Sequence, residues 1–82
     1  MIEIKRWDTG TVIHSGEFGS VRECLEDGVK KRISFYRADL FKADLTDADL
    51  TDANLTRAVL TNADLTGADL TDTNLFKADL SG

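Results

Sequence analysis

Leucine recurs at every fifth residue in the second half of the chain, and the first half has no such period. From residue 38 the sequence divides into nine successive five-residue units, whose commonest form is Ala-Asp-Leu plus two variable residues. Alanine fills the first place in eight units and Asp or Asn fills the second in eight, with Thr73 and Val59 as the exceptions. Residues 33–37 (ISFYR) fit as a tenth unit, with Phe35 in the leucine place. The third-place leucines are Leu40, Leu45, Leu50, Leu55, Leu60, Leu65, Leu70, Leu75 and Leu80.

A period of five suits neither common secondary structure. On an α-helix, at about 100° per residue, successive leucines would spiral and form no stripe. On a flat strand an odd period would send alternate leucines to opposite faces. A chain that bends once per unit brings every leucine inward again, with the Asp and Asn places suited to corner and turn geometry. The sequence therefore predicts a solenoid whose core is a stack of leucines.

The repeated A(D/N)LXX pattern resembles that of the pentapeptide repeat proteins. That resemblance implies a mainly β fold, a right-handed quadrilateral β-helix in which four units form one coil of 20 residues. The ten units of residues 33–82 then make two and a half coils, about 12 Å tall at about 4.8 Å per coil. Because the repeated residues are structural, the pattern is specific for fold and says little about function.

Residues 1–32 are expected to form a cap on the first coil, since the ends of solenoids need a polar-faced cover. Ile2 and Ile4 alternate with polar residues, and residues 7–10 (WDTG) supply a turn, which predicts a β-hairpin. Ser20 with Glu23 predicts a capping box, and a helix should run from about residue 21 to 31. Openings of this kind resemble those of small phage and prophage pentapeptide proteins, so the expected location is the cytoplasm of a bacterial host.

Composition narrows the function classes. The chain has 82 residues, a formal net charge of -5, and no apolar run long enough to span a membrane. The net charge disfavours direct binding to nucleic acid or to an anionic membrane. One cysteine and one histidine cannot build a disulfide or a protein zinc site, and neither a catalytic pairing nor a cofactor motif is present. We therefore expect a non-enzymatic protein without a cofactor.

All of the net negative charge falls in residues 33–82, which carry nine aspartates and four basic residues. Stacking the units at 20-residue intervals gathers seven of these aspartates on two adjoining faces, with no basic residue among them. They are Asp44, Asp47, Asp49, Asp52, Asp64, Asp69 and Asp72.

These aspartates have two interpretations. Asp is the family's usual turn residue, and a charged surface keeps a β-rod soluble. Alternatively, carboxylates about 5 Å apart along a narrow rod imitate DNA phosphates. The leading hypothesis is an acidic DNA mimic that binds a DNA-binding protein or complex. Such a protein would be a phage counter-defence inhibitor such as an anti-CRISPR, or a topoisomerase-directed one, since the quinolone-resistance pentapeptide proteins that bind gyrase resemble DNA in this way. The alternative is a structural or assembly module that only self-associates or scaffolds a phage component.

Two further surfaces follow from the same stacking. Arg37, Arg57 and Lys77 form a basic column, beside Tyr36 and Phe76. The last coil exposes leucines and unpaired backbone groups, which predicts a homodimer joined end to end. Its interface residues would be Leu75, Phe76 and Leu80.

The remaining chemistry-bearing residues have structural interpretations. His14 is predicted to be an exposed strand residue. Cys24 lies on the predicted helix stripe with Val21, Leu25 and Val29, and is expected to be buried packing. The basic run of residues 30–32 is explained by the helix C-terminus, although it could also contact an anionic partner.

Overall fold

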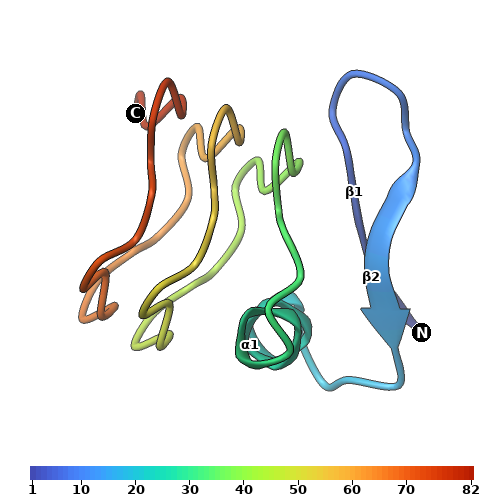
Figure 1. Ribbon diagram of the computed structural model, residues 1–82. Helices are drawn as coiled ribbons and strands as arrows, with labels where there is room; N and C mark the ends of the chain where they lie inside the picture. Colours follow the sequence, from blue (N-terminus) through green and yellow to red (C-terminus); the bar gives the residue numbers. More distant parts are fainter.

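The computed structural model describes the whole chain, residues 1–82. Its regular elements are β1 (Ile2–Lys5), β2 (Val12–Gly16) and α1 (Val21–Lys30), and a long series of stacked turns follows them. Figure 1 shows these turns winding in successive coils, with the hairpin at one end of the stack and the C-terminus at the other. The single helix is too short and too polar to span a membrane.

The hairpin forms where the alternating isoleucines predict it. β1 and β2 pair antiparallel, with Ile2 opposite Gly16 and Ile4 opposite His14. Ile4 is buried while its neighbours Glu3 and Lys5 are exposed, as expected for a strand with one face on the core. The connecting turn closes at Gly10, whose φ of 75° lies in the left-handed region that glycine adopts without strain.

Helix α1 starts at the predicted residue and ends one residue early. The Ser20 hydroxyl accepts a hydrogen bond from the Glu23 N–H at 3.2 Å, as a helix N-cap should. The reciprocal bond of the predicted capping box differs by one residue. The Glu23 carboxylate accepts from the N–H of Gly19 at 2.9 Å instead of from that of Ser20. The helix N-terminus is therefore fixed by two bonds, one of them to the preceding loop.

The repeats stack by backbone hydrogen bonds between residues about 20 apart. The N–H groups of Leu45 and Leu50 donate to the carbonyls of Asp64 and Asp69 at 2.8 and 2.9 Å. Single parallel bridges join Asp44 to Asp64 and Asp49 to Asp69. Such a ladder, advancing one coil for every four units, is a β-helix type of arrangement. It returns each leucine to the inside of the coil.

The bends occupy the fourth and fifth places of each unit, which are among the places expected to face outward or turn the corner. Backbone φ is positive at the fifth place of successive units, not at the second, and an N–H three residues on closes each turn, as from Ala43 to the Leu40 carbonyl at 3.1 Å. The second-place Asp or Asn braces the bend, because its side chain accepts the N–H two residues later. Residues with positive φ at the fifth place are Arg37, Lys42, Asp47, Asp52, Arg57, Asn62, Gly67, Asp72, Lys77 and Gly82.

These bends make the strand content lower than a mainly β fold implies. The only continuous strands are β1 and β2, and the repeats form isolated bridges separated by turns. A left-handed residue at every fifth position ends each extended stretch after about three residues. The expectation of a mainly β fold is therefore met only in part.

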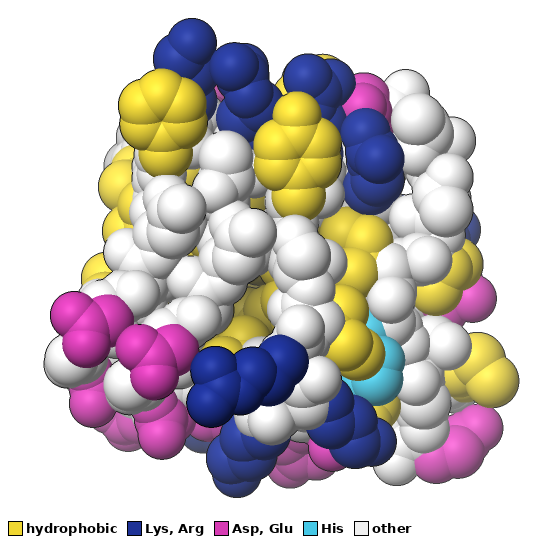
Figure 2. Space-filling model, in the orientation of Figure 1, with side chains coloured by type: hydrophobic (Ala, Val, Ile, Leu, Met, Phe, Trp, Pro, Cys, Tyr) yellow, Lys and Arg dark blue, Asp and Glu magenta, His cyan; other side chains and the backbone are white.

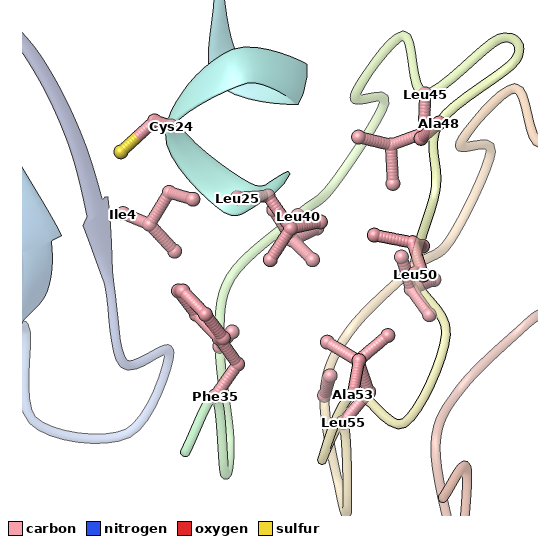
Figure 3. Close-up of a cluster of buried hydrophobic side chains, with 13 residues drawn as sticks. Ile4, Cys24, Leu25, Phe35, Leu40, Leu45, Ala48, Leu50, Ala53 and Leu55 are labelled. Carbon is pink, nitrogen blue, oxygen red and sulfur yellow. The ribbon is translucent and has the colours of Figure 1, made fainter. Parts of the chain in front are cut away.

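The core is continuous from the hairpin through the helix into the coils. Figure 3 shows Ile4, Leu25 and Phe35 grouped beside the leucine stack. The third-place leucines from Leu40 to Leu60 are at most 2% exposed, whereas those from Leu65 to Leu75 are half-buried and Leu80 is 50% exposed. The leucines of the last coil pack on one side only.

The two ends of the coil stack also differ in their polar groups. At the first coil, the Asp39 N–H donates to the Lys5 carbonyl at 2.7 Å, and the Asp49 N–H donates to the Glu26 carboxylate at 2.8 Å. At the last coil, the N–H groups of Leu65 and Leu70 make no hydrogen bond. The hairpin and helix thus pair edge groups that remain free at the opposite end.

Candidate functional site

The seven predicted aspartates are all exposed, and we call them together the acidic surface. Four of them occupy second places and are stacked in pairs, Asp44 with Asp64 and Asp49 with Asp69, by the parallel bridges. The other three, Asp47, Asp52 and Asp72, occupy fifth places at the bends. The coil geometry therefore brings the predicted set together on adjoining faces.

The second-place carboxylates are held by the threonines that follow them. Asp49 accepts from the N–H and the hydroxyl of Thr51 at 3.1 and 2.7 Å, and Asp44 does the same with Thr46. These bonds favour the ionised form, so the threonine hydroxyl and then its N–H lower the pKa of each aspartate. The stacked Asp69 opposes this by raising the pKa of Asp49, to a smaller extent. The carboxylates are thus fixed in direction and ionised at neutral pH.

We predict that acid destabilises the fold through these turns. The pKa values of Asp44, Asp49, Asp64, Asp69 and Asp79 lie below the usual 3.8, chiefly because of the Thr or Ser hydroxyl two residues later. A carboxyl group whose pKa is lower in the folded than in the unfolded state stabilises the fold at pH values above its ordinary pKa. This contribution is lost as the pH falls through the lowered pKa. The urea midpoint should therefore be constant from pH 7 to about pH 5 and fall steadily below about pH 4.

A variant tests the cause of this acid sensitivity. Thr51→Val and Thr71→Val remove two of the hydroxyl donors and leave the backbone N–H bonds in place. The double variant should be less stable at pH 7 and lose less additional stability on acidification. If the double variant lost as much stability on acidification as the parent, the acid sensitivity would be due to other carboxylates.

The helix brings basic residues to the acidic surface, which the repeats alone did not predict. The Arg22 guanidinium donates to the Thr46 carbonyl at 3.3 Å, next to Asp44. A groove of about 410 Å³ between the end of α1 and the coils is lined in part by Lys30, Arg32, Asp49 and Asp52. The expectation of two faces without bases is therefore wrong where the helix adjoins them. Mapping the repeats could not reveal this, because it did not fix where the helix lies.

The basic column is present, but its first member is already paired. The Arg37 N–H donates to the Thr56 carbonyl and the Arg57 N–H to the Phe76 carbonyl, both at 2.9 Å, which stacks the fifth places. The Arg37 guanidinium bonds the Asp8 carboxylate at 2.8 Å and lies 5.2 Å from the centre of the Tyr36 ring. Arg37 therefore joins the hairpin turn to the first coil, and Arg57 and Lys77 remain the outward charges of the column.

Asp8 and Trp7 are the residues that sequence reasoning missed here. Hydrogen bonds from Arg6, and then from Arg37, lower the pKa of Asp8 to about 2. The Trp7 indole N–H donates to the Arg57 carbonyl at 2.8 Å. Both had been assigned only to a turn, because their partners lie 29 and 50 residues away along the chain.

His14 is not the exposed strand residue that was predicted. Its side chain is 13% exposed, and its Nε2 lies 2.8 Å from the Asp27 carboxylate, which also pairs with Lys31. The imidazole packs against the rings of Phe18 and Phe35. It joins β2 to α1, a contact that no local pattern indicates. Cys24 is buried as expected, and burial raises the pKa of its thiol.

The residues assigned to a dimer interface lie on the last coil. Leu75 is half-buried, while Phe76 and Leu80 are 61% and 50% exposed. The Lys77 ammonium stands 5.5 Å from the centre of the Phe76 ring.

The stacked five-residue units and their charged outer surface define a repeat protein with a β-helix type of fold. A profile of the family described as pentapeptide repeats matches residues 32–57 and 43–82, in eight copies. The chain therefore belongs to the pentapeptide repeat family, whose members generally act as structural or interaction proteins and not as enzymes. Neither a curated protein nor a solved structure matches the chain significantly.

Proposed function

We propose that this protein is an acidic decoy that occupies the DNA-binding site of a nucleic-acid-binding protein. The observation that carries the proposal is the stacking of ionised, hydrogen-bonded aspartates in pairs one coil apart. Coils about 4.8 Å apart give a regular array of negative charge on a narrow body. A surface built to contact DNA phosphates through Lys and Arg would attract such an array.

The rigidity of the carboxylates favours this function over a merely solubilising one. A charged coat needs only mobile side chains, whereas four of the seven carboxylates are held by one or two hydrogen bonds each. Side chains already ordered lose less entropy on binding. The small size of the surface corresponds to a few base pairs, which suits a short DNA-recognition cleft, as in a CRISPR surveillance complex, or a topoisomerase site.

The test uses charge removal that keeps the turn chemistry. Asn54 and Asn74 occupy second places and accept the same N–H bonds as the aspartates. Asp49→Asn with Asp69→Asn should therefore keep the fold while removing charge, and Asp52→Asn with Asp72→Asn extends the change to the bends, where Asn62 is native. Captured host proteins should be lost from the fourfold variant, and the parent complex should weaken with salt and be displaced by duplex DNA.

A matched control lies on another side of the coil. Asp39→Asn with Asp79→Asn removes charge of the same kind from second places outside the acidic surface. This control should retain the partner. Equal capture by the fourfold variant and the parent would contradict the decoy function, as would a complex that duplex DNA cannot displace.

The last coil supports a second candidate function, self-association as an assembly module. The N–H groups of Leu65 and Leu70 are unpaired, and the leucines of the last coil are half-buried or exposed. An open edge of this kind invites pairing with a second chain. Light scattering after size-exclusion chromatography should give twice the 9.0 kDa chain mass. Leu80→Glu should return it to the single-chain value, and a single-chain mass for the parent at high concentration would exclude this dimer.

We also propose an architecture for the chain that carries these surfaces. Residues 1–32 serve as the cap of the first coil, and residues 33–82 form a right-handed, four-sided winding of two and a half coils. Phage origin and action in the bacterial cytoplasm would accord with a decoy directed at host DNA-binding proteins. A left-handed winding of residues 33–82 would contradict this architecture.

A further inference from the structure

One side of the coil stack carries no charge on its flat part. Its outward second-place residues are Ser34, Asn54 and Asn74, and the Asn54 amide donates to the Ser34 hydroxyl at 3.2 Å. The other three sides each carry aspartates at these places, as in the pair Asp44 and Asp64. We call the strip of these three polar residues the uncharged side. It is where a second molecule could lie without meeting a row of carboxylates.

Opposite charges border the uncharged side. The bends on one edge carry Asp52 and Asp72, whose positions are stacked by a bond from the Asp52 N–H to the Thr71 carbonyl at 3.0 Å. The bends on the other edge carry Arg57 and Lys77. None of these four side chains forms an ion pair within the chain. Figure 2 shows Lys and Arg gathered along the upper margin of the coil region, and acidic side chains along the lower margin, where further Lys and Arg side chains lie next to them.

We propose that the uncharged side is a self-association surface that takes a second copy of this chain, with the two coil stacks parallel and related by a twofold axis along the stacks. Rotation about such an axis exchanges the two edges and keeps every coil at its height. Arg57 then faces Asp52 of the second copy, and Lys77 faces its Asp72. A twofold axis across the stacks would instead place each edge against its own like charges.

The spacing of the charges is the reason to choose a second copy over another anionic partner. Residues 52 and 57 belong to neighbouring bends of one coil, and residues 72 and 77 to the corresponding bends of the next. Both columns therefore have the same one-coil spacing, so two ion pairs form in register without any adjustment. Asn54 and Asn74 lie between them, and their amides can donate and accept across the contact.

The first coil adds little to this contact. Arg32 lines the same groove as Asp52, occupies the corresponding bend 20 residues earlier, and would face Arg37 of the second copy. The charge of that Arg37 is balanced by Asp8, which lies 2.8 Å away. The electrostatic attraction between the two copies therefore comes from two coils only. The contact area is smaller than the roughly 1,000 Å² expected of a stable interface. The association should be weak, concentration-dependent and opposed by salt.

Charge reversal with residues native to these bends provides the test. Lys42 and Asp47 occupy fifth places with φ of 58° and 60°, so both residue types tolerate the bend. One variant carries Arg57→Asp and Lys77→Asp, and the other carries Asp52→Lys and Asp72→Lys. By sedimentation velocity at low salt, each alone should associate at least tenfold more weakly than the parent. An equimolar mixture should regain association, because each negative column then meets a positive one.

Several results would overturn this inference. The parent could remain a single chain at millimolar concentration, both variants could associate like the parent, or the mixture of folded variants could fail to associate. Binding of an added oligonucleotide by a strictly monomeric parent, lost on Arg57→Asp with Lys77→Asp, would assign the basic edge to an anionic polymer instead. Leu80→Glu serves as the control, since an association that it abolishes belongs to the last coil. None of these outcomes depends on the decoy function.

Discussion

Leu50→Ala is expected to lower the free energy of unfolding by about 3 kcal/mol. The Leu50 side chain is fully buried, with Leu45 and Leu55 of the same coil also fully buried around the axis. Deleting three of its heavy atoms leaves a cavity that a backbone hydrogen-bonded to the next coil cannot close. Total stability for a domain of this size is about 4–12 kcal/mol, so the loss should be evident in the urea midpoint.

Leu80→Ala is the matched control, because Leu80 occupies the same place in the unit but is 50% exposed. Its expected loss is below about 1 kcal/mol, since much of the side chain is already in contact with water. If Leu50→Ala proves too unstable to measure, Leu50→Val gives the same contrast at a smaller scale. Equal losses at the two positions would mean that the leucine stack is not the core.

Gly28→Ala is expected to destabilise the protein by about 1–3 kcal/mol, although alanine is the better helix former. A Cβ at Gly28 would meet the end of the Phe35 ring at less than contact distance, and the His14 ring at 3.1 Å. Gly28 and Phe35 are both buried, so neither the helix nor the ring can move without disturbing the junction of α1 with the first coil. Overpacking should therefore exceed the roughly 1 kcal/mol gained in helix propensity.

A double-mutant cycle with Phe35→Leu tests this reason directly. The smaller leucine matches the residue in the same place of the later units and should relieve the clash. The combined variant should then be more stable than the sum of the two single losses implies. Lys30→Ala, at an exposed position of the same helix, should change stability by less than about 0.5 kcal/mol. Additive losses in the cycle would place the strain elsewhere.

The repeat period accounts for much of the fold that sequence reasoning could predict. Five residues per unit and one bend per unit leave two inward places, the first and the third, and leucine fills the third in every unit from residue 38 on. The stacking of Asp49 on Asp69 follows from the same period, so the predicted acidic surface does come together. The hairpin and the helix were equally predictable, since alternation and capping residues are local signals.

The sequence leaves the position of the bend open among the second, fourth and fifth places, for a physical reason. Asp and Asn favour turns, and both the second and the fifth places carry them. Within a turn, one residue adopts the left-handed conformation while another accepts the N–H bond, and residue type alone does not separate the two roles. The backbone shows that Arg57 and Lys42 also adopt positive φ, which no propensity would have indicated.

The sequence by itself determined the leucine stack, the 20-residue spacing of the aspartates and the two N-terminal elements, because each depends on contacts within a repeat or a single element. Only the tertiary structure decided that α1 brings Arg22 and Lys30 to the acidic surface, that Asp8 holds Arg37, and that His14 pairs with Asp27. Those contacts join segments with no common period, so their partners are set by how the hairpin and helix pack on the first coil.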